Sequence, residues 1–179
     1  MRKLETTEIK RLSIEEIKEI KKLPIIVILN DVRSLHNIGA IFRTCDAFLC
    51  ESIFLCGITG TPPNREIHKT ALGATETVEW KYFNNIFEAL NILTSENYKL
   101  VSLEIAENSI NIENFKLNTK EEKIALIVGN EMNGIDQDVL NICNTCIEIP
   151  QFGTKHSLNV SVSTGIALWK ISTEMRNLK

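Results

Sequence analysis

The chain has 179 residues, of which 44% are hydrophobic, and its formal net charge at pH 7 is −3. This length suits one well-buried domain and is short for two. No apolar stretch reaches the roughly 20 residues that span a bilayer, and the charged N-terminus lacks the apolar core of a signal peptide. We therefore expect a cytoplasmic protein without a membrane partner.

The N-terminal segment is predicted to be an amphipathic helix. Ser13 and Glu16 have the spacing of a capping box, which predicts a helix from about residue 14 to residue 22 that Pro24 ends. Basic residues, Lys10 and Arg11 among them, alternate here with acidic ones. Residues 1–24 are therefore interpreted as a basic, amphipathic helical extension that precedes one main domain, residues 25–179.

Apolar runs of strand length alternate with helical segments along the rest of the chain. Strands are predicted at 25–29, 52–56, 78–83, 99–103, 124–128 and 147–149, and helices at 37–48, 65–72, 85–93, 136–143 and 157–175. Residues 105–120 read as an irregular connection. The strands are uniformly apolar, which is typical of strands buried on both faces. The pattern predicts a three-layer α/β/α domain around a parallel sheet.

The five cysteines are expected to be reduced thiols, because their number is odd and no secretion signal precedes them. Cys143 and Cys146 form a C-x-x-C pair. A metal site would need a second pair or nearby histidines. We therefore interpret the two cysteines as buried small side chains, and no metal site is predicted.

Two loops that follow predicted strands carry candidate functional residues, since ligands bind beyond the carboxyl ends of parallel strands. The loop of residues 30–37 leads into the helix that carries Arg43, and Asn37 is expected to cap that helix. Arg43 has apolar sequence neighbours, so it is expected to pair with a carboxylate or to bind an anion. The loop of residues 129–134 presents Glu131; it lacks the Lys-Ser/Thr of a Walker A motif and also fits a simple turn with an acid at a helix start.

A third loop joins Ile149–Pro150 to Ser157-Leu158-Asn159, after which a helix with small residues in its first turns is predicted. Polar groups before a helix start favour a ligand pocket. His156 lies in this loop, and we interpret it as a phosphate or surface contact rather than a base.

Together, the three segments resemble the three motifs of the TrmH branch of the SPOUT RNA methyltransferases. The matching segments are Asn37–Phe48, Ile127–Ile135 and Ile149–Val162. Their order and spacing also match, and the similarity extends from about residue 25 to about residue 175.

The resemblance implies a C-terminal deep trefoil knot, a homodimer, and S-adenosylmethionine bound in the knot. Contacts to this cofactor are implied at Gly129, Ile149 and Leu158. The implied reaction is 2′-O-methylation of a ribose in tRNA or rRNA. Roles in catalysis are implied for Asn37, Arg43, Glu131, Ser157 and Asn159.

The role of Arg43, which the resemblance places in the site of the partner subunit, stays open between a base and a phosphate anchor. A guanidinium hardly deprotonates in proteins, which favours the anchor. Two rival functions also stay open: a catalytically silent SPOUT protein that binds RNA, and an unrelated nucleotide-binding α/β protein. The net negative charge argues against a nucleic-acid partner, and the sequence specifies neither the RNA nor the nucleotide.

Overall fold

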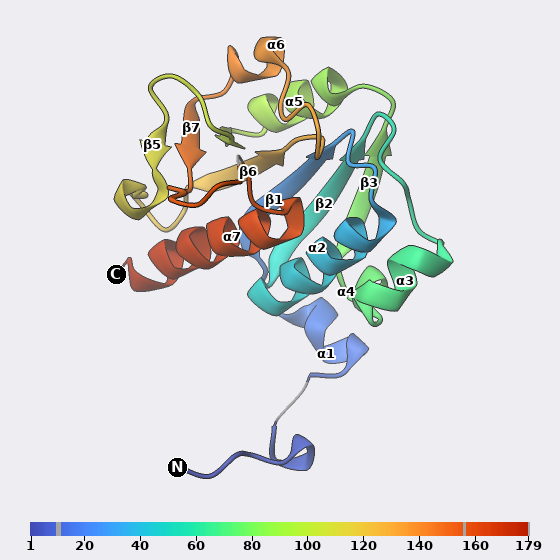
Figure 1. The fold of residues 1–179 in the computed structure, drawn as a ribbon. Helices are drawn as coiled ribbons and strands as arrows, with labels where there is room; N and C mark the ends of the chain where they lie inside the picture. Colours follow the sequence, from blue (N-terminus) through green and yellow to red (C-terminus); the bar gives the residue numbers. More distant parts are fainter. Residues whose placement is uncertain (10–11, 156, 179) are drawn as a thin grey trace.

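The computed structural model describes residues 1–9, 12–155 and 157–178 (Figure 1), so Lys10 and Arg11 of the predicted basic cluster lie outside it. Within this part of the chain a sheet has the strand order β3-β2-β1-β6-β4-β7-β5. The strands are β1 (Leu23–Asn30), β2 (Cys50–Cys56), β3 (Glu79–Phe83), β4 (Tyr98–Leu103), β5 (Ile110–Asn111), β6 (Lys123–Val128) and β7 (Thr145–Glu148). All of these neighbours pair in parallel. The predicted parallel sheet is confirmed.

The central strands are buried on both faces, as their sequences predicted. In β1, Ile25, Val27 and Leu29 enter one hydrophobic core, whereas Ile26 and Ile28 enter the other. Successive side chains of a strand point to opposite faces of the sheet. A strand with apolar residues at every position is therefore stable only when helices cover both of its faces.

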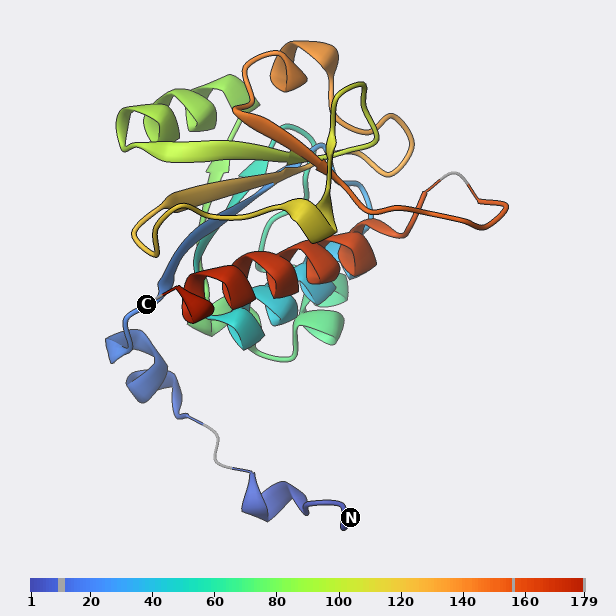
Figure 2. The same cartoon turned by 90° about the vertical axis from the view of Figure 1, so that its left-hand side faces the viewer.

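Helices do cover both faces (Figure 2). Those that contribute to the first core are α2 (Leu35–Phe48), α3 (Arg65–Ala71), α4 (Ala74–Thr77) and α7 (Val160–Asn177). Those that contribute to the second core are α5 (Ile86–Ser95) and α6 (Gln137–Leu140). The N-terminal α1 (Ile14–Glu19) begins at the predicted Ser13–Glu16 capping box and contacts α4. The three-layer prediction is confirmed.

Several predicted boundaries were wrong. Helix α1 ends at Glu19 instead of residue 22, because Ile20 is already extended and Leu23 pairs with Cys50 at the start of β1. Helix α6 spans only four of the eight predicted residues. The predicted irregular connection 105–120 contains β5 and a 3-10 helix, η2 (Ile112–Asn114). Helix α4 and a second 3-10 helix, η1 (Thr6–Glu8), were not predicted.

The strand order reverses next to β1, which pairs with β2 on one side and with β6 on the other. Ligands of open α/β sheets bind at such a reversal, beyond the carboxyl ends of the strands. Leu29 of β1 is in register with Val128 of β6. The loops that follow these two residues, 31–34 and 129–134, therefore start side by side.

The cysteines agree with the prediction in part. All five are free, but Cys143 and Cys146 are half-buried rather than buried, because α6 ends at Leu140 and leaves Cys143 at the surface end of the second core. Among the described residues no group of three or more His, Cys, Asp and Glu side chains is arranged to hold a metal ion. In the same part of the chain no helix is long and apolar enough to cross a membrane.

Candidate active site

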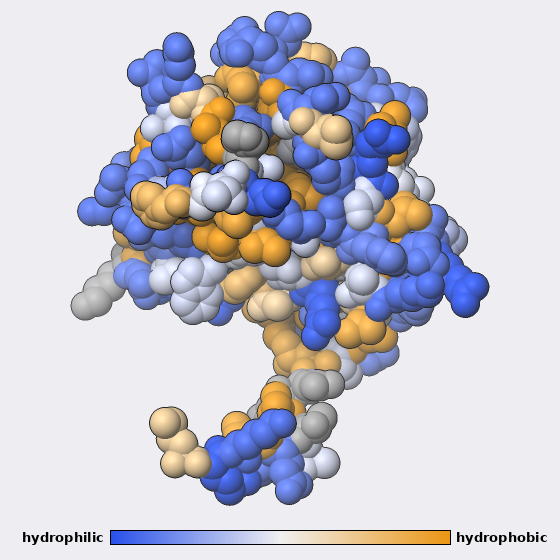
Figure 3. All heavy atoms as spheres, viewed as in Figure 1, coloured by the Kyte–Doolittle hydropathy of each residue, from blue (hydrophilic) through white to orange (hydrophobic). Residues whose placement is uncertain are grey.

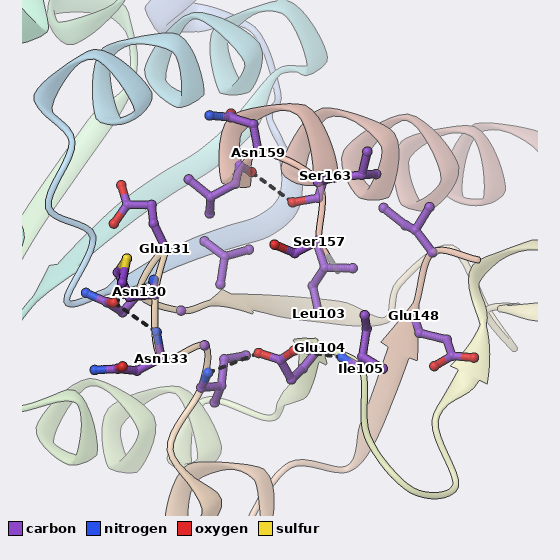
Figure 4. A pocket seen from close by; sticks show the side chains of 18 of the residues that line it. Leu103, Glu104, Ile105, Asn130, Glu131, Asn133, Glu148, Ser157, Asn159 and Ser163 are labelled. Carbon is purple, nitrogen blue, oxygen red and sulfur yellow. Dashed lines mark hydrogen bonds between the residues drawn. The ribbon is translucent and has the colours of Figure 1, made fainter. Parts of the chain in front are cut away.

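A pocket of about 660 Å³ opens at the carboxyl ends of β4, β6 and β7 (Figure 4). Its walls come from residues 103–105, 128–135, 148–149, 151, 157–160 and 163, with Leu140 from α6. Six of the eight residues predicted for the site line it: Gly129, Glu131, Ile149, Ser157, Leu158 and Asn159. Asn37 and Arg43 do not line the pocket. The structure therefore brings residues of the second and third motifs together at one pocket.

The loop after β6 is held in shape by its own backbone and by Asn130. The backbone N–H of Asn130 donates to the Gly134 carbonyl (3.1 Å), and the N–H of Gly134 donates to the Asn130 carbonyl (2.9 Å). The Asn130 side chain accepts the N–H groups of Met132 (2.9 Å) and Asn133 (3.1 Å) (Figure 4). A Cβ at Gly129 would overlap the backbone of Gly134, so only glycine fits there.

Glu104 fastens the same loop to the end of β4. One carboxylate oxygen accepts the backbone N–H of Ile135 (3.1 Å), and the other accepts that of Ile105 (2.7 Å). Glu104 was not predicted from the sequence. The available signal was an acidic side chain placed directly after a buried strand, at the edge of the sheet where ligands bind.

Glu131 joins the loop after β6 to the loop after β1. Its carboxylate accepts the backbone N–H groups of Arg33 and Ser34 (both 3.0 Å) and the side-chain amide of Asn37 (3.0 Å). Partial burial disfavours the charged form, but these hydrogen bonds outweigh burial and lower the pKa of Glu131 below its ordinary value. Both oxygens are engaged by donors, so this carboxylate fixes the position of the loops.

Asn159 links the third loop to the first. Its side-chain oxygen accepts the N–H groups of Ser161 (2.9 Å) and Val162 (3.4 Å) at the start of α7, so its NH₂ group must be the donor to Asn37 (3.1 Å). Asn37 therefore accepts through oxygen and donates through nitrogen to Glu131. The three predicted motifs form one hydrogen-bonded chain.

Two predictions about helix starts were wrong. Asn37 does not cap α2; the cap is Ser34, whose hydroxyl accepts the Asn37 N–H (3.3 Å). Likewise α7 begins at Val160 and not at Ser157, with Asn159 as its cap. Glu131 accepts the backbone N–H groups of Arg33 and Ser34 where α2 begins, and this moves the cap position from Asn37 to Ser34, three residues earlier. The side chain of Asn37 is therefore free to join the hydrogen-bonded chain.

Arg43 was expected to lie among apolar groups, but its side chain is exposed on α2. Its sequence neighbours Ile41 and Phe42 face the core, because adjacent helical residues point in different directions. Within the described residues the Arg43 guanidinium makes no hydrogen bond or ion pair. It is an available cation next to the packing contact between α2 and α7, where a Cβ on Gly165 would touch Thr44.

The pocket carries negative charge. Its described lining includes the carboxylates of Glu104, Glu131 and Glu148 and no Lys, Arg or His. The Ser157 hydroxyl has no hydrogen-bond partner in the described part of the chain. His156, which was interpreted as a phosphate contact, lies outside the described residues.

The parallel sheet has helices on both faces, and the loops after β4, β6 and β7 form the pocket. These features define the class of the protein: an α/β protein with a small-ligand site at the carboxyl edge of its sheet. A model of the SpoU rRNA Methylase family matches residues 24–169. The chain belongs to this family.

Relatives and solved structures give the same family. An "Uncharacterized tRNA/rRNA methyltransferase" of Borreliella burgdorferi is 30% identical over 158 residues, which cover 88% of this chain and 68% of that protein. The tRNA (guanosine(18)-2'-O)-methyltransferase of Aquifex aeolicus is 30% identical over 157 residues, 88% of this chain and 72% of that protein. The AdoMet-bound rRNA methyltransferase structure from Sinorhizobium meliloti superposes with a TM-score of 0.79 at 25% identity, covering 91% of this chain and 61% of that one. Across four such relatives the matched share of the relative ranges from 57% to 72%.

Proposed function

We propose that the chain transfers the methyl group of S-adenosylmethionine to a ribose 2′-hydroxyl in tRNA or rRNA. The observation that carries the proposal is the chain of hydrogen bonds from Asn159 through Asn37 to Glu131 at the rim of the pocket. It joins the three segments that resemble the family's motifs. Relatives named as tRNA or rRNA 2′-O-methyltransferases add support.

The pocket suits S-adenosylmethionine in size and charge. Its volume of about 660 Å³ lies within the range of roughly 300–1,000 Å³ that is typical of small-ligand sites. Its apolar lining, which includes Ile149 and Leu158, suits the adenine ring, and Gly129 lets a ligand approach the backbone closely. Its three carboxylates suit a cationic ligand. When bound, the cofactor supplies an electrophilic methyl group on a sulfonium.

The side chains have different tasks in this proposal. The Ser157 hydroxyl is proposed to hold the ribose hydroxyl, because it lines the pocket and makes no hydrogen bond within the described residues. Asn37, Asn159 and Glu131 position the three loops relative to one another, and correct positioning alone supplies up to about 7–11 kcal/mol of a reaction barrier. Glu131 is proposed as a positioning residue rather than a base, because its hydrogen bonds lower its pKa and so make it a weaker base.

Arg43 is proposed to anchor the phosphate beside the target ribose in the site of a partner subunit. The proposed dimer face is the exposed apolar stripe of α7, formed by Val162, Ile166 and Trp169, which are 51%, 38% and 63% exposed. Because α7 packs against α2, this stripe adjoins the helix that carries Arg43. Such a stripe is costly in water unless another surface covers it.

The dimer is tested by sedimentation. Ile166→Glu is expected to yield a monomer, whereas Ile92→Glu, at a similarly exposed position on α5, should leave the association state unchanged. A monomeric parent chain would refute the dimer.

The trefoil knot of the family is proposed here as well. Strand β7 lies between β4 and β5, and both of these strands belong to the stretch that runs from β4 to β6. After β7 the chain continues into α7, where Lys170 donates to the Glu113 carbonyl of that same stretch (3.1 Å). The chain thus enters between two strands of the β4–β6 stretch and then leaves past that stretch, which fits a threaded arrangement.

Free thiols and an RNA substrate support our placement of the protein in the cytoplasm.

Transfer of tritium from labelled S-adenosylmethionine into total RNA tests the function. Asn159→Ala is expected to abolish transfer, because it breaks the link between the third and first motifs. Asn85→Ala is the matched control: Asn85 also caps a helix through its side chain, but it caps α5, away from the pocket. Equal loss in both variants would mean that Asn159 acts through stability alone.

The catalytically silent alternative predicts RNA binding without transfer by the parent chain, and transfer would exclude it. Calorimetry with S-adenosylhomocysteine, ATP and NAD separates the proposal from an unrelated nucleotide-binding protein.

Arg43→Lys is expected to keep cofactor binding and to reduce transfer sharply, since a lysine cannot make the forked contact to phosphate. Unchanged turnover would contradict the anchor role.

A further inference from the structure

A second pocket, of about 580 Å³, lies at the β3 edge of the sheet and has no lining residue in common with the first. This volume also falls within the range of roughly 300–1,000 Å³ for small-ligand sites. Its lining includes Pro62, Pro63, Arg65, His68, Glu76 and Trp80. The pocket therefore combines flat apolar surfaces with several polar groups.

Trp80 gives this pocket a rigid aromatic wall. It lies on β3, the edge strand, and its partly buried ring packs against the first hydrophobic core. The indole N–H makes no hydrogen bond in the part of the chain that the structure describes, although such a group usually finds a partner when it is buried. An anchored ring with a free donor is suited to stacking against a nucleobase, a contact that tolerates every base.

The polar groups around Trp80 are also available. The side chains of Arg65 and His68 are exposed, and neither makes a hydrogen bond or ion pair within the described residues. Glu76 contributes a carboxylate, which repels phosphate but accepts hydrogen bonds from a base amino group. The surface over α3, at the right-hand edge of Figure 3, is largely hydrophilic.

Helix α3 connects this pocket to the network of the candidate active site. The Thr70 hydroxyl donates to the carbonyl of His36 (3.0 Å), and the His36 ring is bonded to Glu66 (3.0 Å), which also pairs with Lys69 (2.7 Å). His36 directly precedes Asn37. The two helices touch closely, because a Cβ at Gly39 would overlap the carbonyl of Ile67. The second pocket is thus held rigidly relative to Asn37.

We propose that this pocket binds an unpaired base of the substrate RNA, with the base stacked on Trp80 and a neighbouring phosphate on Arg65. The proposal rests on the proposed function, since it assumes that the chain acts on RNA. It gives a protein of net charge −3 a local contact for the strand that leads to the methylated ribose. Single-stranded segments, whose bases can be splayed out, are the parts of RNA that proteins read most readily.

Tryptophan fluorescence tests the site directly, because the chain has only two tryptophans, Trp80 and Trp169. In a Trp169→Phe background Trp80 is the sole reporter. A single-stranded oligouridylate of about 12 nucleotides, a length that strand-binding proteins cover, is expected to quench it. A blunt RNA duplex of equal length and polyglutamate of equal charge are expected to quench it much less.

Variants of the otherwise unchanged full chain test the contacts. Trp80→Leu is expected to weaken oligouridylate binding about 5- to 100-fold in filter binding. Arg65→Gln is expected to reduce the slope of log affinity against log salt by about 0.7, the value for one phosphate contact of a single strand. Lys81→Gln is the matched control, since Lys81 follows Trp80 in β3 and extends over the Phe54 ring of the other core. It should leave both quantities unchanged.

Equal quenching by oligouridylate, duplex and polyglutamate would overturn the proposal, as would unchanged affinity in Trp80→Leu. Retained affinity of each variant for S-adenosylhomocysteine shows that the fold and the first pocket are intact. Failure of the proposed function looks different, because the parent chain would then transfer no methyl group and would bind no S-adenosylhomocysteine. The fluorescence result does not depend on turnover, so the two failures are distinguishable.

Discussion

Replacement of Glu131 by Gln tests whether one carboxylate holds the first two motifs together. The amide keeps the shape of the side chain, but it presents one NH₂ group where the carboxylate accepts N–H donors from Arg33, Ser34 and Asn37. A hydrogen bond to a charged group contributes about 1.5–3 kcal/mol. Because Glu131 is partly exposed, solvent screening reduces this to an expected loss of about 1–2 kcal/mol in the free energy of unfolding. For a chain of this length, that corresponds to a fall in Tm of about 2–8 °C.

The pH dependence of that difference provides a sharper measurement. The pKa of Glu131 is lowered in the folded state from an ordinary 4.5. Its stabilising contribution is therefore fully present above pH 4.5 and is lost as the pH falls through the lower folded value. The difference in unfolding free energy between parent and Glu131→Gln should shrink over that interval, because the protonated acid resembles the amide.

Urea unfolding with a double-mutant cycle completes the test. Glu131→Gln and Asn37→Ala should show a coupling energy of about 0.5–3 kcal/mol, as expected for residues in one network. The matched control is Glu107→Gln, at an exposed glutamate that makes no side-chain hydrogen bond within the described residues. Additive effects, or equal Tm values for Glu131→Gln and Glu107→Gln, would refute the proposed fastening of the loops.

Three further substitutions test close contacts and a helix cap. Gly129→Ala should lower the affinity for S-adenosylhomocysteine about 5- to 150-fold in calorimetry, since overpacking against Gly134 costs about 1–3 kcal/mol; Gly153→Ala, which meets no atom, should not. Ser34→Ala removes the cap of α2 and should cost about 0.5–2 kcal/mol in urea unfolding. Gly39→Ala should cost about 1–3 kcal/mol in the same assay, because α2 and α3 touch there; a neutral result would contradict that contact.

The sheet and the meeting of the second and third motifs were predictable from sequence, because they follow from local patterns and one topological rule. Strands with apolar residues at every position require cover on both faces. Loops after parallel strands share one edge of the sheet. These two facts place Glu131 and Asn159 at a common site before any contact is known.

The details that failed depend on contacts distant in sequence. Ser34 and Asn37 are both good helix caps, and the choice between them is made by Glu131, which holds the N–H of Ser34 from 97 residues away. The strand β5 has two residues and exists through its pairing with Glu148 and Ile147 of β7. No local pattern contains that information.

The net negative charge argued against an RNA partner, but its distribution in the structure weakens that argument. Three carboxylates line the first pocket, where the proposed cofactor is a cation. Glu131 lies between this pocket and the start of α2. Both of its carboxylate oxygens accept hydrogen bonds from the backbone N–H groups that precede α2. Beyond it, on α3, Arg65 and His68 are unpaired within the described residues. Three carboxylates thus gather around one proposed ligand, whereas the other proposed ligand has the unpaired guanidinium of Arg65 beside it. The net charge of the chain therefore does not identify the partner.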